Sequence, residues 1–573
     1  MTNVLKRKLR TAKTLIDDGG LGVIGPYLWE KRLILATRGI WKSQAARRAE
    51  NERAYADWFA ASRPDAEERR RQHDTVFTHR VSFVVPAYNT DPGMLKALVD
   101  SLLNQTNDAW EVCFYDGQSP KAETREALKR AAERDPRIHV CFGEANDGIS
   151  GNTNHALEMV TTDWVALLDH DDLVTEDAVY CVLKAAEAGA DFLYSDEDKC
   201  DERGTRFFEP HLKGDPAPDT LRAGNYICHL MAMETALIRR VGALRSDFDG
   251  SQDHDLALRA MEAAARPVHI PRVLYHWRMV GSSASHQGAA RCAGAAARAV
   301  DEQLGRLGLP GHAETEILHL RVRPDESVTA DAALILRCED EKTLSAWLDR
   351  VRRKSKSGVR EVLLLGTDKA YRFGDIPCVS LGDCAAEQAA ERARARQLVF
   401  LTQGVVPSSA DWLRELALFA DRADVACAGG NIMTKKCVNL FGGYAVSGGT
   451  VTNAHGGISR YTPPYMLEDR QNRNVTAVSR HLMMIGRERF LALGGFGGDA
   501  TDRGAVLLGL RALKAGYLNV YANEGGGIAP EGFAGHFDSG AVDTTEPERY
   551  QHPAFAAGDG LLVIDPARPM PEA

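Results

Sequence analysis

The chain has 573 residues, of which 44% are hydrophobic and 26% are charged. This composition is ordinary for a packed soluble protein and excludes wholesale disorder and a collagen-like fibre, and the length predicts about three or four domains. The net charge of −9 argues against a dedicated nucleic-acid binder, which would show a strong basic excess.

The first 80 residues differ in charge from the rest of the chain. They hold 17 Lys and Arg against 10 Asp and Glu, a balance of +7 that leaves −16 for the remainder. We predict a basic helical region over residues 1–78. Solvated helices are its simplest interpretation, and the alternative is binding to an anionic membrane surface through the basic cluster at 6–10 and the apolar stretch at 21–41.

Cysteine spacing and hydropathy bear on the cellular compartment. Eleven cysteines lie between Cys113 and Cys437 with no CxxC pair, which fits neither a disulfide framework nor a thiolate metal site. We therefore expect reduced cysteines in a cytosolic protein. The first residues lack the uninterrupted apolar core of a signal peptide, and no window approaches the roughly 18 apolar residues of a membrane span. We expect a protein that does not cross a membrane.

From residue 81 onward, short apolar runs alternate with amphipathic stretches. We predict four strands and, between them, two helices, at residues 81–85, 110–115, 138–142 and 164–168 and at residues 95–103 and 121–134. This alternation predicts an α/β domain with a mostly parallel central sheet, to which we assign residues 79–322. Ligands of such sheets bind at the carboxyl ends of the strands, where Tyr88, Asn89 and Asp116 stand.

A second α/β pattern begins near Asp331. Its strands and helices are expected at residues 332–336, 361–365 and 398–401 and at residues 344–353 and 412–420. The two patterns look like divergent copies of one domain, and we assign residues 330–545 to the second. The Pro-rich tail, residues 546–573, is predicted to be loosely ordered.

The strongest chemical motif is a Leu-Asp-His-Asp-Asp run at the end of the strand predicted at 164–168. It places Asp169, Asp171 and Asp172 within four positions. Clustered carboxylates are costly unless a cation neutralises them, and Mg²⁺ or Mn²⁺ together with substrate phosphates does this well. Helix capping by Asp171 or Asp172 is the simpler alternative, but it explains one aspartate rather than three.

Two weaker patterns also point to a site. The loop around Asn146 and Gly148 offers small residues and amide donors where a ligand could approach closely, although loop punctuation is the default interpretation. Asp253 follows Gln252 at the start of a predicted helix. A carboxylate there is well placed to take a proton from a hydroxyl, although the helix dipole alone would favour it.

A Tyr-His-Trp-Arg run follows this helix on a predicted strand. His276 could serve there as a metal ligand and Arg278 as a phosphate contact. On composition alone, each of these side chains is more often structural than functional.

Taken in order, these motifs resemble family 2 glycosyltransferases. The match rests on the strand at 81–90, the LLNQT run at 102–106, the strand and turn at 110–119, the Leu-Asp-His-Asp-Asp run, and the Gln-Asp-His-Asp-Leu and His-Trp-Arg segments. It covers about residues 79–285. The resemblance implies a GT-A fold, a nucleotide-diphosphate sugar donor, Mn²⁺ or Mg²⁺, and inverting transfer.

The resemblance also implies a role for each matching residue. Asp253 would be the catalytic base that deprotonates the acceptor hydroxyl, Asp171 would ligate the metal, and His276 is a candidate for a further metal ligand. Gln252 and Arg278 are candidates for acceptor or phosphate contacts. The donor would be held by Pro86, Tyr88, Asn89, Asp116, Asn146, Gly148 and Asp169.

Some positions depart from the family pattern. The paired aspartates usual after the second strand are Tyr115 and Asp116 here, so base recognition is expected to differ, and Gln252 stands where Glu is common. The segment at 194–199 resembles members that build bacterial surface polysaccharides. In the second pattern the metal carboxylates are missing and only Asp502 remains at the helix start. We predict a degenerate GT-A-like domain that positions an acceptor glycan or holds a dimer together.

The sequence thus predicts a metal-dependent glycosyltransferase of cell-surface polysaccharide biosynthesis. Its acceptor would be a glycan or lipid-linked oligosaccharide, its location cytoplasmic and peripheral to the inner face of the plasma membrane, and no nucleic acid would be involved. One alternative is a metal-dependent nucleotidyltransferase, which does not explain the acidic helix start at Asp253. The other is a non-catalytic glycan-binding or scaffolding subunit, against which the intact acidic motifs of the first half argue.

Overall fold

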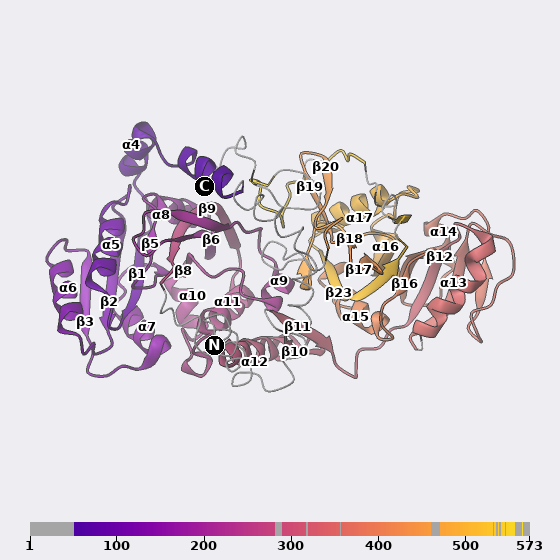
Figure 1. Cartoon of the computed structure of the whole chain (residues 1–573), viewed down its shortest axis with the longest axis horizontal. Coiled ribbons are helices and arrows are strands. Elements are labelled where there is room, and N and C mark those ends of the chain that lie inside the picture. The colour runs from indigo at the N-terminus through magenta and orange to yellow at the C-terminus, as the bar shows by residue number, and fades with distance from the viewer. Residues whose placement is uncertain are drawn as a thin grey trace, which may run out of the picture. The chain divides into compact units, whose positions relative to one another are not determined.

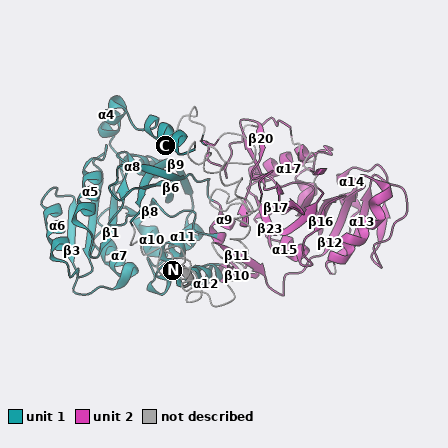
Figure 2. Cartoon of the chain, in the orientation of Figure 1, with its two compact units in different colours: residues 1–216, 224–303, 564–573 teal, residues 217–223, 304–563 magenta. Residues whose placement is uncertain are grey.

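The computed structural model describes residues 51–280, 289–316, 319–355, 357–459, 470–530, 532–533, 537, 540–544, 546–555 and 564 (Figure 1). They form two compact units (Figure 2). The first takes the described residues within 1–216, 224–303 and 564–573, and the second takes those within 217–223 and 304–563. In the described part of the chain, every helix is too short or too polar to span a membrane.

The described part of the basic amino-terminal region is helical. Residues 51–61 form one helix and α4 (Ala66–Asp74) forms another. The Asp65 carboxylate caps α4 by accepting hydrogen bonds from two amides of its first turn, at 2.9 Å each. The cluster at 6–10 and the apolar stretch at 21–41 lie outside the described residues, so membrane-surface binding stays a prediction.

The sheet of the first unit begins with four parallel strands in the order β3-β2-β1-β4. They are β1 (Val81–Ala87), β2 (Trp110–Asp116), β3 (Ile138–Phe142) and β4 (Trp164–Leu167). β1 and β2 are buried on both faces, as uninterrupted apolar runs of a parallel sheet require. The connecting helices are α5 (Pro92–Leu103), α6 (Ala122–Ala132), α7 (Gly148–Glu158) and α8 (Ala178–Glu187).

The sheet continues past β4 in the order β8-β6-β9-β5, with β7 on β6. Here β4 and β6 pair antiparallel to β8, whereas β6 and β9 are parallel. The strands are β5 (Leu173–Val174), β6 (Phe192–Cys200), β7 (Phe207–His211), β8 (Met231–Glu234) and β9 (Pro267–Arg278). The helices are α10 (Thr235–Arg240), the short 3₁₀ helix η2 (Ser246–Phe248), α11 (Gln252–Ala263) and α12 (Ala289–Leu307).

One hydrophobic core holds the parallel half of this sheet to its helices. Side chains from β1, β2 and β4 are buried in it together with the apolar stripes of α5 and α8. On α5 this stripe is Leu95, Leu98, Val99 and Leu102, the helical spacing visible in the sequence. The ends of the strands are therefore fixed relative to one another, and that is where the polar residues lie.

The second unit holds a ten-stranded sheet, two separate pairs of antiparallel strands and six α-helices among its described residues. Its sheet strands are β12 (Ala332–Arg337), β13 (Val359–Leu365), β14 (Cys378–Ser380), β15 (Gln397–Thr402), β16 (Val406–Pro407), β17 (Val425–Thr434), β18 (Asn439–Phe441), β21 (Arg473–Asn474), β22 (Leu482–Gly486) and β23 (Leu518–Ala529). β19 (Tyr444–Ser447) and β20 (Thr450–Asn453) form a hairpin, and β10 (Gly311–Thr315) pairs with β11 (Leu320–Pro324). The helices are α9 (Pro218–Ala223), α13 (Glu341–Lys354), α14 (Ala386–Arg392), α15 (Trp412–Ala420), α16 (Arg487–Ala492) and α17 (Asp502–Lys514).

The sheet of the second unit repeats that of the first. Its order is β14-β13-β12-β15-β22-β17-β23-β16, with β18 on β17, which matches β3-β2-β1-β4-β8-β6-β9-β5 with β7 on β6; β21, which pairs with β23, is an additional strand. Parallel and antiparallel pairs also correspond, since β15 and β17 are antiparallel to β22 and β17 is parallel to β23. The prediction of an α/β fold with a mostly parallel sheet and a second sheet domain is confirmed.

Candidate functional site

A pocket of about 100 Å³ opens at the carboxyl ends of β1 and β4 in the first unit. Distant parts of the sequence meet in it: Pro86 in β1, Asp169 after β4, and Gln252 and Asp253 at the start of α11. His229, from the loop before β8, also lines it. The pocket thus gathers four residues that the sequence predicted for the site and one that it did not.

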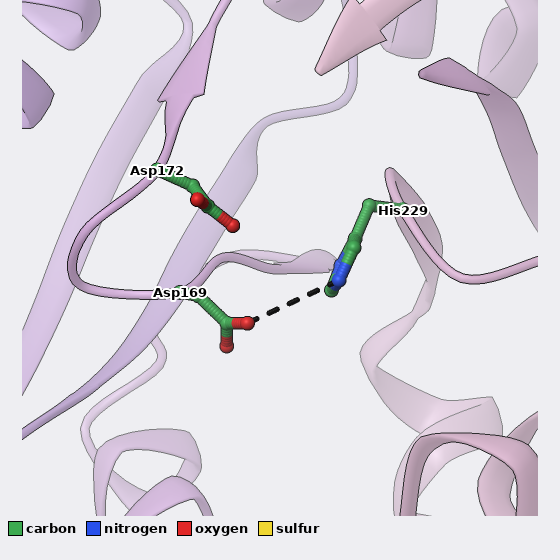
Figure 3. A group of neighbouring side chains, drawn as sticks. All are labelled: Asp169, Asp172 and His229. Carbon is green, nitrogen blue, oxygen red and sulfur yellow. Dashed lines mark ion pairs between the residues drawn. The ribbon is translucent and has the colours of Figure 1, made fainter. Parts of the chain in front are cut away.

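Asp169, Asp172 and His229 form a group of potential metal ligands (Figure 3). One ligand atom from each lies within 4.8 Å of the others, and the distance from Asp169 Oδ2 to His229 Nε2 is 3.9 Å. Two carboxylates and an imidazole suit a divalent cation such as Mn²⁺ or Mg²⁺. This group, found among the described residues, offers the carboxylate oxygen ligands that the acidic motif predicted.

Tyr275 on β9 contacts all three members of this group. Its hydroxyl donates to Asp172 Oδ2 at 2.5 Å and accepts from the Asp169 amide at 3.3 Å. Its ring stacks on the His229 imidazole, with 4.4 Å between centroids and an interplanar angle of 10°. A single buried side chain therefore orients the ligand group, as outer hydrogen bonds do in metal sites.

The two carboxylates of the group destabilise each other's ionised form. Burial raises the pKa of Asp172 well above its usual value, and the nearby charges of Asp169 and Asp171 raise it further. Burial also raises the pKa of Asp169; the attraction of His229 opposes this shift, and the charges of Asp171 and Asp253 add to it. A bound cation would relieve this repulsion, so the group fits a metal electrostatically as well as in its donor atoms.

A buried lysine clamps the loop that carries His229. Lys213 Nζ donates to the carbonyl oxygens of Ser195, Ile227 and His229 at 2.6, 2.6 and 2.5 Å, and lies 3.5 Å from Glu197 Oε2. The same oxygen of Glu197 accepts from the His229 amide at 2.7 Å. Burial raises the pKa of Glu197, but Lys213 and two nearby histidines outweigh burial and hold it at about 2. Glu197 is therefore ionised and ties the loop to β6.

Asp253 lies in the first turn of α11, on the wall of the pocket. Its Oδ2 accepts a hydrogen bond from Asn225 Nδ2 at 2.9 Å. Gln252, beside it, accepts from the Gly250 amide at 2.8 Å. Asp255, two residues further along the helix, is instead bound by Arg245 and Arg259, and Arg259 Nη2 lies 2.6 Å from its Oδ2. Asp253 is thus the carboxylate of this helix that faces the pocket.

The residues expected to hold the donor base lie at neighbouring strand ends. Asp116, the last residue of β2, is fully buried and accepts from the Ser119 amide at 3.2 Å. The Asn89 amide donates to the Ser119 hydroxyl at 2.8 Å, so the turns after β1 and β2 are joined. Tyr88 is 41% exposed at this edge. The structure brings Tyr88, Asn89 and Asp116 close together, and their roles in donor binding stay predictions.

Asn146 and Gly148 shape the turn before α7. Asn146 Oδ1 accepts from the Gly148 amide at 3.2 Å and from Asn152 at 2.8 Å. Gly148 has φ +77°, and a Cβ there would lie 2.8 Å from Asp249 Oδ2, so both conformation and space require glycine. These contacts account for the turn locally, and donor contact by either residue stays a prediction.

Arg278 holds the acidic turn in place through hydrogen bonds to Asp171 and Asp172. Its amide donates to Asp172 Oδ1 at 2.7 Å, its Nε donates to the Asp171 carbonyl, and its Nη1 donates to the Glu202 carbonyl at 2.8 Å. The Asp171 side chain is 29% exposed and lies 3.9 Å from His170 Nδ1. Asp171 is therefore in the same turn as the ligand group but not one of its three members, and its role as a metal ligand stays a prediction.

His276 faces the buried acidic strand β6 rather than the ligand group. Its Nδ1 is 2.5 Å from Asp198 Oδ1, and its ring lies 4.1 Å from that of Phe207. Three successive carboxylates of β6 each pair with a histidine in this way: Asp196 with His269, Glu197 with His211 and Asp198 with His276. The acidic segment at 194–199 is thus part of the sheet. The bond to Asp198 leaves Nε2 of His276 to ligate a metal, and that role stays a prediction.

Strand register identifies the same positions in the second unit. Val165 of β4 pairs with Ser82 of β1, and Leu398 of β15 pairs with Ala333 of β12 in the corresponding place. The residues four, six and seven positions after Val165 are Asp169, Asp171 and Asp172. Those at the same distances after Leu398 are Thr402, Gly404 and Val405, which are therefore the equivalent residues. The same comparison through β8 and β22 equates His229 with His481. The second copy keeps the histidine and lacks every carboxylate of the acidic turn.

Asp502, the acidic residue kept at the start of α17, is buried and internally bound. It accepts from the hydroxyls of Tyr444 and Ser479, the latter at 2.8 Å, and from the Arg480 amide at 3.1 Å. His481 is directed to Thr402, with 2.7 Å between Nδ1 and Oγ1. These side chains hydrogen-bond to one another, as buried structural residues do.

Comparison with known proteins finds a family match within the first unit. Residues 82–243 match the family Glycosyl transferase family 2. The chain is 30% identical, over 77% of its length, to the uncharacterized protein y4gI of Sinorhizobium fredii, and 28% identical, over 80%, to the O-antigen biosynthesis protein RfbC of Myxococcus xanthus. It spans 52% and 38% of these two relatives, about half of their length or less.

Solved structures overlap the chain in part. The mannosyltransferase PcManGT from Pyrobaculum calidifontis, in complex with GDP-Man and Mn²⁺, is 20% identical with a TM-score of 0.31, covering 45% of this chain and 76% of that chain. Part of S. aureus TarS in complex with UDP-GlcNAc is 19% identical with a TM-score of 0.30, covering 36% and 61%.

Proposed function

Because residues 82–243 match Glycosyl transferase family 2, we propose that the first unit transfers a sugar from a nucleotide-diphosphate donor to an acceptor hydroxyl with inversion. The observation that carries this proposal is the pocket that joins Asp169 and His229 to Asp253 at the carboxyl ends of β1 and β4. A ligand group for a metal and a carboxylate base on one pocket wall are what such a transfer needs.

The donor would lie along the strand ends. Asp116, Tyr88 and Asn89 would hold its base and ribose, and the acidic turn would lie beside its diphosphate. Asp169, Asp172 and His229 would hold Mn²⁺ or Mg²⁺, with Asp171 in the same turn. The cation would neutralise negative charge on the departing diphosphate.

Asp253 would act on the opposite side of the sugar. Its carboxylate would accept the proton of the acceptor hydroxyl as that oxygen attacks the anomeric carbon, while Asn225 fixes Oδ2 at 2.9 Å. Attack from the side opposite the leaving diphosphate inverts the anomeric configuration. Tyr275 and Lys213 would take no part in proton transfer; they orient the ligand group and the loop of His229.

Polysaccharide biosynthesis is the process that the relatives support, since one of them is named for O-antigen biosynthesis. The acceptor would be a glycan or a lipid-linked glycan, and the chain would work in the cytoplasm, at the inner face of the plasma membrane. The second unit would carry out no metal-dependent transfer, because Thr402, Gly404 and Val405 replace the acidic turn, and it would position the acceptor.

The test is turnover of a panel of UDP- and GDP-sugars with Mn²⁺ by the whole chain and by Asp169→Asn. We expect metal-dependent release of a nucleoside diphosphate that falls at least about 100-fold in the variant. Asp108→Asn, the same change at a 68% exposed aspartate, should retain full turnover. Release of a sugar 1-phosphate, the leaving group when the nucleoside monophosphate is transferred, would identify a nucleotidyltransferase instead, and glycan binding without turnover of any donor would identify a scaffold.

A further inference from the structure

The first unit holds a second cavity besides the pocket at the strand ends. Its volume is about 320 Å³, at the lower end of the roughly 300–1,000 Å³ of small-molecule pockets. Its walls come from the helix at 51–61 and the turn after it, from α5, from the strand pair β5 and β9, and from the hairpin of β6 and β7. The cavity is therefore large enough for a small molecule.

The strand pair β5 and β9 separates this cavity from the ligand group. Successive residues of a strand point to opposite faces. On β9, Tyr275 contacts Asp172 and His229, whereas the next residue, His276, lines the cavity. Leu173 on β5 pairs with His276 and also lines it. The two pockets share no lining residue, so a molecule in this cavity would not occupy the proposed donor site.

Positive charge exceeds negative charge at the cavity. Three carboxylates line it, and each is paired with cations: Asp100 with Lys96 and Arg134, Glu176 with Arg63 and Arg69, and Asp177 with Arg272. Arg203 also lines the cavity and has no ion-pair partner in the described part of the chain. Six cations therefore stand against three carboxylates, and this surplus favours an anionic ligand.

Arg272 is a fixed guanidinium on the cavity wall. Its Nη2 donates to Asp177 Oδ2 at 2.7 Å and to the Ser62 carbonyl oxygen at 3.0 Å. Its Nε is buried and, among the described residues, has no hydrogen-bond partner. A buried donor without a partner is costly, and a bond from a guanidinium to an anion is among the strongest hydrogen bonds in proteins. An anionic group in the cavity would satisfy this donor.

Aromatic rings form the apolar part of the wall. Phe59 and Phe207 line the cavity with 5.7 Å between their ring centroids, and the ring of Phe207 lies 4.1 Å from that of His276. Aromatic rings beside a few charged groups suit a ligand with one apolar face and an ionised substituent. A sugar ring that carries a carboxylate or a phosphate has both.

We propose that this cavity is a second binding site of the first unit, for a sugar that carries an anionic group. The anionic group would bind Arg272 and Arg203, and the apolar face of the sugar would lie against Phe207. That the ligand is a sugar rests on the proposed function of this unit. The site would hold such a sugar of an acceptor or product glycan without metal or nucleotide.

The test is calorimetric titration of the whole chain, in chelator and without nucleotide. The probes are glucuronate, galacturonate, glucose 6-phosphate, methyl glucoside and inorganic phosphate. We expect a uronate or the sugar phosphate to bind, and which of them binds more tightly distinguishes a carboxylate from a phosphate ligand. Methyl glucoside has no charge and inorganic phosphate has no ring, so each should bind at least about tenfold more weakly. Addition of UDP and Mn²⁺ should not displace the bound sugar.

Three variants assign the binding to this cavity. Arg272→Gln should weaken it at least about tenfold, and Arg203→Gln, which breaks no ion pair of the described chain, about threefold. Arg206→Gln is the matched control, because this exposed arginine of the same hairpin does not line the cavity, and it should leave the affinity unchanged.

The proposal is overturned if no charged sugar binds, if inorganic phosphate binds as tightly as the sugars, or if Arg272→Gln and Arg203→Gln both leave the affinity unchanged. Donor turnover is measured separately. If the chain binds a charged sugar in this way but turns over no nucleotide-sugar, the second site stands and the proposed function fails.

Discussion

Glu197→Gln should destabilise the first unit in a pH-dependent way. The side chain is buried on β6 and binds Lys213 and the His229 amide. Lys213 and the nearby histidines hold the pKa of Glu197 at about 2, against an ordinary value of 4.5. Since the folded pKa is depressed, the stabilisation is fully present above pH 4.5 and is lost as the pH falls towards 2.

The size of the effect follows from this shift. A difference of about 2.5 pKa units corresponds to about 3 kcal/mol at pH 5, where the unfolded carboxyl is also ionised. At pH 3 most of the unfolded chains carry a protonated Glu197, and the contribution falls to about 1.5 kcal/mol. The variant should therefore be less stable than the unaltered chain by about twice as much at pH 5 as at pH 3.

Urea denaturation at the two pH values measures this difference, with hydrogen exchange of β6 identifying the transition of the first unit. Glu209→Gln is the matched control, because Glu209 also pairs with a lysine, Lys199 at 2.9 Å, but is 33% exposed. Exposed ion pairs contribute about 0–1 kcal/mol. A Glu197→Gln deficit below 1 kcal/mol at pH 5, or one that is equal at both pH values, would refute the assignment of a buried, ionised clamp.

Three further predictions concern the ligand group. Tyr275→Phe keeps the ring stack on His229 but removes the hydrogen bond to Asp172. Mn²⁺ affinity measured by calorimetry should therefore fall about 10- to 100-fold, while the thermal midpoint changes little. Unchanged affinity would contradict the role of the hydroxyl. Because the pKa values of Asp169 and Asp172 are raised and a metal binds the ionised forms, Mn²⁺ affinity should weaken on acidification at pH values above the ordinary carboxyl value of 3.8, and a titration that stays flat down to that value would count against it. Chelation should abolish donor turnover and Mn²⁺ should restore it at one ion per chain, because the second unit lacks the acidic turn; two ions of equal affinity would show that the second copy also binds metal.

The parts of the site that the sequence predicted are local. The run from Asp169 to Asp172 follows an apolar strand, and Asp253 opens a helix, so their positions at strand and helix ends follow from patterns of a few residues. The structure places Asp169 beside Pro86 in one pocket because parallel strands end at a common edge, and the start of α11 brings Asp253 to the same pocket. Four parallel strands of the first unit and three of the second could likewise be located from the sequence, because each is a short uninterrupted apolar run.

The parts that escaped prediction depend on contacts between distant residues. His229 has no motif around it; its place is set by Lys213, Glu197 and Tyr275, which come from three other segments. Metal ligation by His276, which the resemblance implied, stays a prediction, and the orientation of its ring depends on Asp198, 78 residues earlier in the chain. Likewise, no local pattern marks 217–223 as part of the second unit, because Asp219 in this segment pairs with Arg422, 203 residues later in the chain.

The account's central claim is a single metal-dependent site in the first unit, held by Asp169, Asp172 and His229. The most direct test is anomalous diffraction at the manganese edge from crystals of the whole chain with Mn²⁺ and UDP or GDP. We predict one manganese peak, bonded to these three side chains and to the diphosphate, and none beside Thr402 and His481. A peak bonded to His276, a peak in the second unit, or a nucleotide bound without metal would contradict it.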